Sequence, residues 1–494
     1  MTLFKDVAVG VIRNNKILWN PSREDLRKMA RHEETTSQYG SACYFTKVRN
    51  RGAKFTEIVG MKLTKEQEQA LKEVREHLKG KRLICMERTM GVHPEMQFKC
   101  RTVVPVEYAK IVFMWQEMLF EPNEQADADT TVIFVPEWKE IRILVEPEDG
   151  ITFVLGSDYF GECKKGHLRM ATYQAKRDKG YLGLHAATKK ISVLENGKMV
   201  GKGFVLFGLS GTGKTSLTVH DHGLSKGVEI IQDDFVIMSR KGYCYGTENG
   251  FYLKTEGLDE SQRALYKAAT SPEAVFENVY VDGEGVIHFK DYRYTTNGRG
   301  IIPRAAIPEC SKSIDLKRVD FIIFIARRND VVPPVVRLSA EQAAAAFMLG
   351  ESIETSAGDP SRAGEAVRCV GTNPFIIGDL HEEGHIFLDI LKKNPSMQCF
   401  MLNTGAVGGD DITVNDSATI LREIARGDIK WKKDPHWKYE IPVSVKGVEK
   451  KKLNPMNYYS EQEYRKLVDR LKEEREKWFG KFPELDKSIV TAFS

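Results

Sequence analysis

The pattern of apolar and polar positions changes near residue 190. Before that point, a helical pattern of charged and apolar positions over residues 65–81 is followed by two short runs typical of β-strands, residues 131–135 and 141–145. Beyond it, apolar runs alternate with glycine-rich or acidic turns and predict the buried strands of a sheet. These runs are residues 203–208, 228–232, 321–326 and 399–403.

These patterns predict an α/β protein with two domains. A chain of 494 residues exceeds the length at which one hydrophobic core usually stops growing. We expect a mixed N-terminal domain over residues 1–180 and a C-terminal domain over residues 181–494 that holds the predicted sheet. Near the C-terminus, residues 460–479 carry Leu467 and Leu471 on one face and predict an amphipathic surface helix.

Composition excludes several classes of protein. Hydrophobic residues make up 41% of the chain and the net charge is +4, so the chain is too apolar to be disordered and too weakly basic to favour nucleic-acid binding. The eight cysteines contain no Cys-x-x-Cys pair, which fits a reducing compartment. No apolar run approaches the ~20 residues of a membrane helix. We therefore expect a cytoplasmic protein with no membrane partner; whether it is a monomer or a homo-oligomer stays open.

A glycine-rich segment follows the apolar run that ends at Phe207. Residues 208–215 read Gly-Leu-Ser-Gly-Thr-Gly-Lys-Thr, which is the spacing of a phosphate-binding loop between a strand and a helix. Glycines permit positive φ and let backbone N–H groups face a polyphosphate, and a helix start adds partial positive charge. We expect Lys214 to neutralise the transferring phosphate and Thr215 to ligate nucleotide-bound Mg²⁺. The predicted nucleotide-binding residues are Gly208, Leu209, Ser210, Gly211, Thr212, Gly213, Lys214 and Thr215. We therefore expect residues 181–494 to form the nucleotide domain, with the active site in the cleft between the two domains.

Two carboxylates stand at the end of a predicted strand. Asp233 and Asp234 directly follow the apolar run at residues 228–232. Adjacent like charges repel each other unless a metal or a basic side chain is close, so the pair indicates a cation site.

A second metal-like pattern lies at residues 381–385, which read His-Glu-Glu-Gly-His. Two histidines one helical turn apart with a glutamate are typical of zinc metalloproteases. We reject this interpretation because Gly384 weakens the helix and no third ligand follows at a familiar spacing. We expect instead a polar entry to a helix that begins at Ile386.

Short motifs extend along the chain beyond the phosphate loop. Residues 159–166 read Tyr-Phe-Gly-Glu-Cys-Lys-Lys-Gly, and residues 183–186 read Gly-Leu-His-Ala. In order and spacing the motifs resemble those of ATP-dependent phosphoenolpyruvate carboxykinases, and the resemblance covers most of the chain. The further matching segments are residues 250–255, 276–279, 297–299, 332–335 and 402–405.

The resemblance implies a reaction and a set of metal ligands. Oxaloacetate would lose carbon dioxide, and the resulting enolate would take the γ-phosphate of a nucleoside triphosphate to give phosphoenolpyruvate. The active-site metal implied is Mn²⁺, held by Lys165, His185 and Asp234, with Mg²⁺ accompanying the nucleotide. A lysine can ligate a metal only when neutral, and burial beside a divalent cation favours that form.

The resemblance also implies roles for residues that contact the substrates. Arg51 aligns with the arginine that receives the substrate carboxylate, although Arg49 is an alternative. Arg299 would bind the carboxylate or phosphoryl side of the substrate, and Tyr159 would contact carbon dioxide. Lys254 would screen charge on the transferring phosphate, and Ser210 and Lys214 complete the catalytic set.

Two segments depart from the family pattern. Where the family has Arg-Ile beside the adenine, this chain has Asp411 and Ile412, and an aspartate cannot stack on a base as a guanidinium does. The base of the nucleotide therefore stays open, although ATP is the expected donor. The segment at residues 357–362 also differs from the family's mobile lid, which excludes water during transfer.

Two other functions fit parts of these data. The first is a kinase of the same fold that phosphorylates another small molecule or a serine; the presence of Arg51, Tyr159 and Arg299 at family spacing disfavours it. The second is a nucleotide sensor without turnover, which the presence of Lys214 and of all the metal ligands disfavours. A phosphoenolpyruvate carboxykinase acting on oxaloacetate, carbon dioxide and nucleotide is the expected function.

Overall fold

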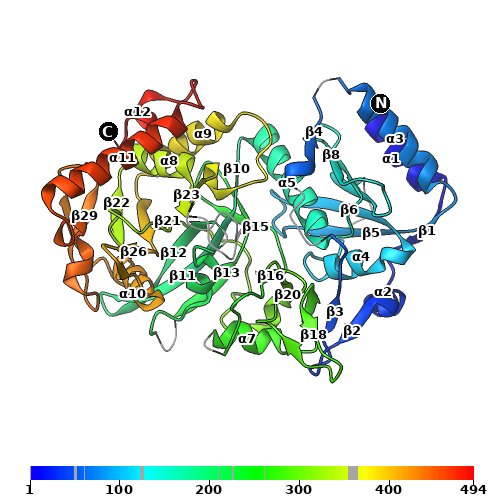
Figure 1. Cartoon of the computed structure of the whole chain (residues 1–494), viewed down its shortest axis with the longest axis horizontal. Helices are drawn as coiled ribbons and strands as arrows, with labels where there is room; N and C mark the ends of the chain where they lie inside the picture. Colours follow the sequence, from blue (N-terminus) through cyan, green and yellow to red (C-terminus); the bar gives the residue numbers. More distant parts are fainter. Residues whose placement is uncertain are drawn as a thin grey trace. The chain divides into compact units, whose positions relative to one another are not determined.

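The computed structural model describes residues 2–48, 53–60, 62–122, 127–209, 211–224, 227–260, 262–353 and 365–493. They form mixed α/β structure with several β-sheets (Figure 1). The chain divides into two compact units, one made of Met1–Lys179 and Thr247–Pro308, the other of Gly180–Gly246 and Glu309–Ser494. The single boundary expected at residue 180 does not describe this arrangement, because Thr247–Pro308 pack with the first unit.

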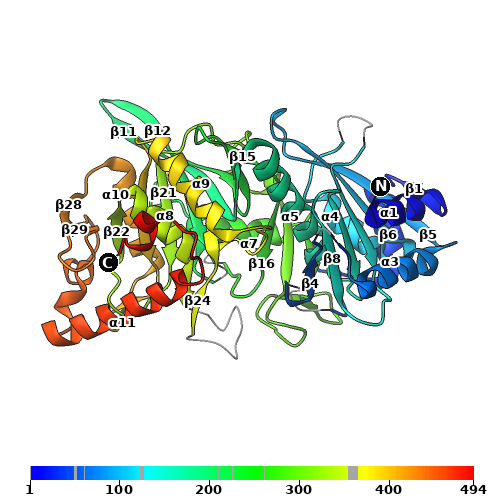
Figure 2. The same ribbon diagram turned by 90° about the horizontal axis from the view of Figure 1, so that it is seen from above.

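The first unit is built on a seven-stranded sheet with the order β1-β5-β6-β7-β9-β8-β4. Side chains alternate between the faces of a strand, so each face forms its own core. Helices α1 (Leu3–Arg13) and α3 (Lys65–Leu78) cover one face, where they pack on strand residues such as Ile133 and Phe153. The two helices lie beside each other in Figure 2. The strands are β1 (Lys16–Trp19), β4 (Thr56–Ile58), β5 (Arg82–Met90), β6 (Phe98–Pro105), β7 (Thr130–Val135), β8 (Arg142–Glu146) and β9 (Ile151–Leu155).

The opposite face is covered by α4 (Ala109–Gln116) and α5 (Phe160–Lys179). A buried histidine joins α5 to the sheet: the ring nitrogens of His167 hydrogen-bond the hydroxyls of Thr102 at 2.9 Å and Thr130 at 2.7 Å, and the ring stacks on Trp115. Burial lowers the pKa of His167 to about 3, so the imidazole is neutral. This contact fixes the helix that carries Lys165.

A five-stranded sheet with the order β16-β20-β17-β3-β2 completes the first unit. Its register places Lys254 opposite Arg299, and Arg299 opposite Glu277 on the next strand. Helices α2 (Arg23–Ala30) and α7 (Arg263–Ala269) and a small hairpin of β18 (Tyr280–Val281) and β19 (Ile287–His288) accompany it. The strands are β2 (Glu34–Thr36), β3 (Ala42–Tyr44), β16 (Gly250–Lys254), β17 (Val275–Glu277) and β20 (Arg299–Pro303).

The second unit is built on an eight-stranded mixed sheet with the order β13-β11-β12-β21-β25-β22-β29-β28. The apolar runs expected as buried strands are confirmed as parts of β12, β13, β21 and β25. The strands are β11 (Ala186–Glu195), β12 (Lys198–Gly208), β13 (Val228–Gln232), β21 (Phe321–Ala326), β22 (Val335–Leu338), β25 (Gln398–Asn403), β28 (Lys430–Lys433) and β29 (Glu440–Ser444).

Helices cover both faces of this sheet. Alternate strand residues such as Phe207 and Phe324 face α8 (Ala340–Leu349), α9 (Leu380–Lys393) and α11 (Glu461–Phe479), while their neighbours face α6 (Lys214–Val219) and α10 (Val414–Arg426). In Figure 1, α8, α9 and α11 lie on one side of the strands and α10 on the other. Helix α11 confirms the amphipathic helix expected over residues 460–479. The smaller elements are β10 (Leu182–Leu184), β14 (Val236–Met238), β15 (Cys244–Gly246), β23 (Glu351–Ile353), β24 (Ala366–Arg368), β26 (Ala406–Val407), β27 (Asp410–Asp411) and α12 (Lys487–Val490).

Among the helices of the described residues, none is long and apolar enough to cross a membrane.

Replacing Phe153 by alanine tests the core of the first unit. The side chain is fully buried and packs edge to face on Phe4 with ring centroids 5.6 Å apart. We expect Phe153→Ala to lower the free energy of unfolding by about 3–5 kcal/mol through lost burial and a cavity. Urea-induced unfolding followed by circular dichroism measures the change. Ile58→Ala, at a side chain that is 45% exposed, is the control and should change it by less than about 0.5 kcal/mol. Equal effects of both variants would contradict this account of the core.

Candidate active site

The chemistry-bearing residues of the second unit gather at one edge of the eight-stranded sheet. Strands β12, β21 and β25 are parallel, so their carboxyl ends lie at that edge. Strand β11 is antiparallel to both β12 and β13, so its first residue and the last residue of β13 lie there too. The glycine-rich loop after β12, Asp233 and Asp234 after β13 and His185 before β11 therefore converge. Ligands of open α/β sheets commonly bind where strands end in this way.

The glycine-rich loop joins β12 directly to α6, which begins at Lys214. Gly211 and Gly213 have φ values of +87° and +93°, a conformation that side chains other than glycine rarely adopt. The loop is also tied to β25, because the Thr404 hydroxyl donates to the Thr212 carbonyl at 2.9 Å. Ser210 lies outside the described residues.

The far end of α6 is held by a buried lysine. The Lys189 amine on β11 donates to the carbonyls of Leu217 and His220 at 2.9 and 3.0 Å, and it lies 2.8 Å from Nε2 of His222. Burial lowers the pKa of Lys189. The three acceptors oppose that shift, because only the ammonium form offers three N–H donors. Lys189 thus fixes the helix that follows the loop.

Asp234 joins Lys214 and His185. Its Oδ1 atom lies 3.0 Å from Lys214 Nζ and 3.0 Å from His185 Nε2. Only 8% of the Lys214 side chain and 14% of the His185 side chain are exposed, so the interaction is only partly screened by water. Next to them, Thr215 Oγ1 lies 3.4 Å from Asp233 Oδ2.

The tautomer of His185 follows from its other partner. Nδ1 lies 2.6 Å from the carbonyl oxygen of Thr372, which can only accept, so Nδ1 carries the proton. Burial, with Lys214 adding to it, lowers the pKa of His185. In the neutral form, an unprotonated Nε2 therefore faces a carboxylate oxygen of Asp234. Two acceptors this close favour a cation between them, and imidazole with carboxylate is a donor pair that suits a divalent metal.

The described residues contain no group of three or more His, Cys, Asp and Glu side chains arranged to hold a metal ion. Any metal bound by His185 and Asp234 would therefore take its remaining ligands from groups of other types.

The first unit carries a second group of predicted site residues, connected by hydrogen bonds. Tyr159 is 2% exposed, and its hydroxyl lies 3.1 Å from the Tyr252 hydroxyl. Asn297 Nδ2 donates to the same Tyr159 hydroxyl at 3.2 Å, while Asn297 Oδ1 accepts from Arg299 at 2.8 Å. The Arg299 guanidinium also lies over the Tyr252 ring, 5.3 Å from its centroid. The phenol and the guanidinium are thereby held in one network.

The two lysines among the predicted site residues of this unit are paired with carboxylates. Lys165 donates to Glu162 one turn earlier on α5, and its amine lies 5.5 Å from the Tyr159 ring centroid. Lys254 pairs with Glu256 at 2.5 Å. These contacts within the protein fix the positions of both amines.

A buried carboxyl group belongs to the same group. Glu277 is 1% exposed, and its Oε1 accepts the N–H of Phe160 at 2.8 Å. Burial raises the pKa of Glu277 to about 8. At neutral pH this side chain is predominantly the uncharged acid.

Ile412 and Asp411 belong to the segment predicted to contact the base of the nucleotide. Ile412 is buried, and its N–H donates to the Gly405 carbonyl at 2.8 Å, whereas Asp411 is exposed. Arg49, Arg51 and the segment at residues 357–362 lie outside the described residues.

The metalloprotease-like segment is an ordinary part of α9. The helix begins at Leu380, so the expected start at Ile386 is wrong. Gly384 packs closely there: an added Cβ would lie 2.7 Å from the Met348 sulfur, so the methionine side chain would have to shift. His381 pairs with Glu484, and Nε2 of His385 accepts the Asp486 N–H at 3.0 Å. Both imidazoles therefore serve contacts with the C-terminal segment.

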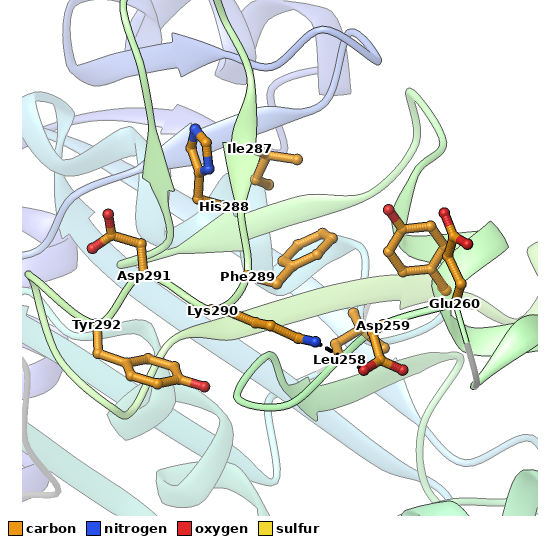
Figure 3. A pocket seen from close by; sticks show the side chains of 10 residues that line it. Leu258, Asp259, Glu260, Ile287, His288, Phe289, Lys290, Asp291 and Tyr292 are labelled. Atoms are coloured by element: carbon orange, nitrogen blue, oxygen red, sulfur yellow. Dashed lines mark hydrogen bonds and ion pairs between the residues drawn. The ribbon is translucent and has the colours of Figure 1, made fainter.

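A cavity of about 970 Å³ in the first unit is separate from these groups. Figure 3 shows Lys290 pointing toward Asp259 across it, and the two form an ion pair at 3.0 Å. Among the predicted site residues that the structure describes, none lines this cavity.

Sequence reasoning missed Tyr252, Asn297 and Glu277 as members of the site. All three stand in short motifs that matched the family, which was the available signal. Their partners lie far away in sequence, so only the folded chain reveals what they contact.

Comparison with known proteins shows which family the chain belongs to. Residues 15–451 match the family model described as phosphoenolpyruvate carboxykinase. The chain belongs to the phosphoenolpyruvate carboxykinase family. This membership confirms the resemblance seen in the motifs.

Individual relatives of this family match over most of the chain. A protein named phosphoenolpyruvate carboxykinase (ATP) from Aeropyrum pernix is 34% identical over 489 residues, 97% of this chain and 98% of the relative. A protein of the same name from Sinorhizobium medicae is 27% identical over 425 residues, 80% and 76% of the two chains. One from Staphylococcus aureus is 26% identical over 406 residues, 76% and 73%.

The raised pKa of Glu277 predicts how stability depends on pH. Since its value of about 8 lies above the ordinary 4.5, the folded protein binds a proton that the unfolded protein has released between these pH values. Stability should therefore fall as pH rises through this window. Glu277→Gln removes this proton, so its free energy of unfolding should rise relative to wild type from pH 5 to pH 8. Urea unfolding at both pH values measures the difference, with Glu260→Gln at an exposed site as control. A parallel pH dependence of wild type and Glu277→Gln would exclude the raised pKa.

Proposed function

We propose that this protein is an ATP-dependent phosphoenolpyruvate carboxykinase. The C–C bond to one carboxylate of oxaloacetate breaks, carbon dioxide leaves, and the electron pair forms an enolate. The enolate oxygen then attacks the γ-phosphorus of ATP while the bond to the β-phosphate oxygen breaks, giving phosphoenolpyruvate and ADP. The observation that carries the proposal is the meeting of Lys214, His185 and Asp234 at one sheet edge, in a chain of this family.

On the nucleotide side, the proposed role of the protein is to bind the phosphates. Backbone N–H groups of residues 208–213 and the start of α6 would hold the phosphates. Lys214 would neutralise charge on the γ-phosphate as it transfers, with Ser210 beside it, and Thr215 would ligate the Mg²⁺ that accompanies ATP. Ile412 would contact the base.

On the oxaloacetate side, the proposed role of the protein is to orient the anionic substrate. Arg51 would receive one carboxylate, and Arg299, already oriented by Asn297, would receive the other carboxylate or the phosphoryl group. The Tyr159 hydroxyl would face carbon dioxide as it forms. Lys254 would contribute positive charge near the transferring phosphate.

We propose that Lys165, His185 and Asp234 hold the active-site metal, with Mn²⁺ as the ion that suits amine, imidazole and carboxylate ligands. The bound ion would supply positive charge to the oxygen on which the enolate charge develops. Lys165 must release its proton to serve as a ligand, and Glu162 is placed to accept its N–H and keep the amine oriented.

The decisive experiment supplies purified protein with oxaloacetate, Mg²⁺, Mn²⁺ and either ATP, GTP, ITP or pyrophosphate, and measures phosphoenolpyruvate. We expect product with ATP. Lys214→Ala should lower kcat by about 100-fold or more, because it removes charge stabilisation of the transferring phosphoryl group. Lys198→Ala, at an exposed lysine of β12, is the matched control and should keep full activity. ATP binding without phosphoenolpyruvate would overturn the proposal and favour a kinase with another acceptor.

Metal binding tests the proposed ligands. Asp234→Asn should weaken Mn²⁺ binding at least about tenfold, because a neutral amide replaces a charged ligand. Titration of the nucleotide-free protein with Mn²⁺, followed by electron paramagnetic resonance, measures the affinity. Asp221→Asn, at an exposed aspartate of the same unit, should leave it unchanged. Equal affinity of wild type and Asp234→Asn would remove Asp234 from the ligand set.

A further inference from the structure

The motif at residues 276–279 has no role in the proposed mechanism, yet its two central residues are almost completely buried. Glu277 is 1% exposed and Asn278 is 2% exposed. They stand at the end of β17, which lies between β20 and β3 in the five-stranded sheet. The dipeptide therefore sits between β20, the strand that carries Arg299, and β3, the strand that runs into residues 45–48.

Glu277 joins this sheet to the start of α5. The first N–H groups of a helix have no partner within the helix, so a side-chain oxygen that accepts one of them is favourable. Glu277 Oε1 accepts the N–H of Phe160, the first residue of α5, at 2.8 Å. Phe160 directly follows Tyr159, and α5 carries Lys165. Since Glu277 is paired in register with Arg299, it fixes the start of α5 relative to that arginine.

Asn278 holds a second segment by three hydrogen bonds. Its N–H donates to the Tyr44 carbonyl at 2.8 Å, its Oδ1 accepts the Thr46 N–H at 2.9 Å, and its Nδ2 donates to Thr46 Oγ1 at 2.7 Å. Its φ of +58° is one that asparagine tolerates better than most residues. Asn278 thus anchors the chain just after β3.

The same segment is held from its other side by Asp158. This carboxylate accepts the N–H groups of Lys47 and Val48 at 3.0 and 3.1 Å, and it pairs with the buried Lys110 at 3.1 Å. Asp158 directly precedes Tyr159. The two anchored segments are thus also joined to each other.

We infer that Glu277 and Asn278 are positioning residues for the oxaloacetate side of the reaction, holding the start of α5 and the segment after β3 on the sheet that carries Lys254 and Arg299. Neither side chain needs to touch the substrate. The inference takes the identity of the substrate from the proposed function. A shift of about 1 Å in a binding group can lower a rate about 100-fold, so loss of these hydrogen bonds should be visible in kinetics.

The first test compares Glu277→Leu with Glu277→Gln. Glutamine keeps an oxygen that can accept the Phe160 N–H and matches the uncharged acid in shape, whereas leucine accepts nothing. We expect Glu277→Leu to lower kcat/KM for oxaloacetate about 10- to 100-fold. The KM for ATP should stay within about twofold, because the glycine-rich loop belongs to the other unit. Glu277→Gln should retain wild-type kcat/KM.

Asn278→Gly provides an independent second variant. Glycine adopts positive φ without strain, so the backbone is preserved while both side-chain hydrogen bonds are lost. We expect the same selective loss in kcat/KM for oxaloacetate. Should Glu277→Leu not fold, Asn278→Gly carries the test by itself.

Hydrogen–deuterium exchange separates this inference from the proposed function. In wild type and Glu277→Gln, peptides over residues 158–165 should exchange slowly, and in Glu277→Leu the same peptides should exchange faster. In Asn278→Gly, peptides over residues 44–48 should exchange faster than in wild type. Absence of phosphoenolpyruvate in the wild type would refute the proposed function and leave this exchange test in force. The inference is overturned if Glu277→Gln loses as much activity as Glu277→Leu, which would mean that the carboxyl group itself reacts. It is also overturned if Glu277→Leu and Asn278→Gly keep both wild-type kinetics and slow exchange.

Discussion

The second unit is organised around one oxygen atom of Asp234, which lies 3.0 Å from both Lys214 and His185. Asp234 follows β13, His185 precedes β11, and Lys214 opens the helix that follows β12 and its loop. The interaction therefore exists only when β11, β12 and β13 are paired in register. In a site with little exposure to water, a carboxylate and an ammonium group attract each other more strongly than they would in solution. The same oxygen faces the unprotonated Nε2 of His185. This arrangement joins the loop that precedes α6 to the proposed metal ligands.

Buried lysines in the first unit are likewise paired with carboxylates. Lys110 pairs with Asp158, and Lys164 pairs with Glu248 at 2.6 Å with both side chains at most 5% exposed. An unpaired charge at such depth would strongly destabilise the fold, so carboxylates accompany these lysines into the interior. Their hydrogen bonds also fix side-chain directions before a substrate arrives. A reaction that depends mainly on placing positive charge benefits from such preorganisation.

Sequence patterns correctly predicted the features that depend on neighbouring residues in the chain. Glycine spacing after an apolar run predicted a turn with positive φ, and the structure has it at Gly211 and Gly213. The rules failed at α9, where Gly384 was taken as a weak point and the helix begins before it, at Leu380. The penalty of glycine in a helix is small, and close packing against Met348 outweighs it.

The sequence by itself determined the family, the type of fold and the residue types available for phosphate and metal binding, because these follow from motifs of a few residues and from strand-length apolar runs. Only the tertiary structure decided which residues meet. The return of Thr247–Pro308 to the first unit, the contacts among Tyr159, Tyr252 and Asn297, and the junction at Glu277 and Asn278 depend on strand order and register. Pairings between residues more than 90 positions apart arise from the packing of whole sheets, and no short window of sequence carries that information.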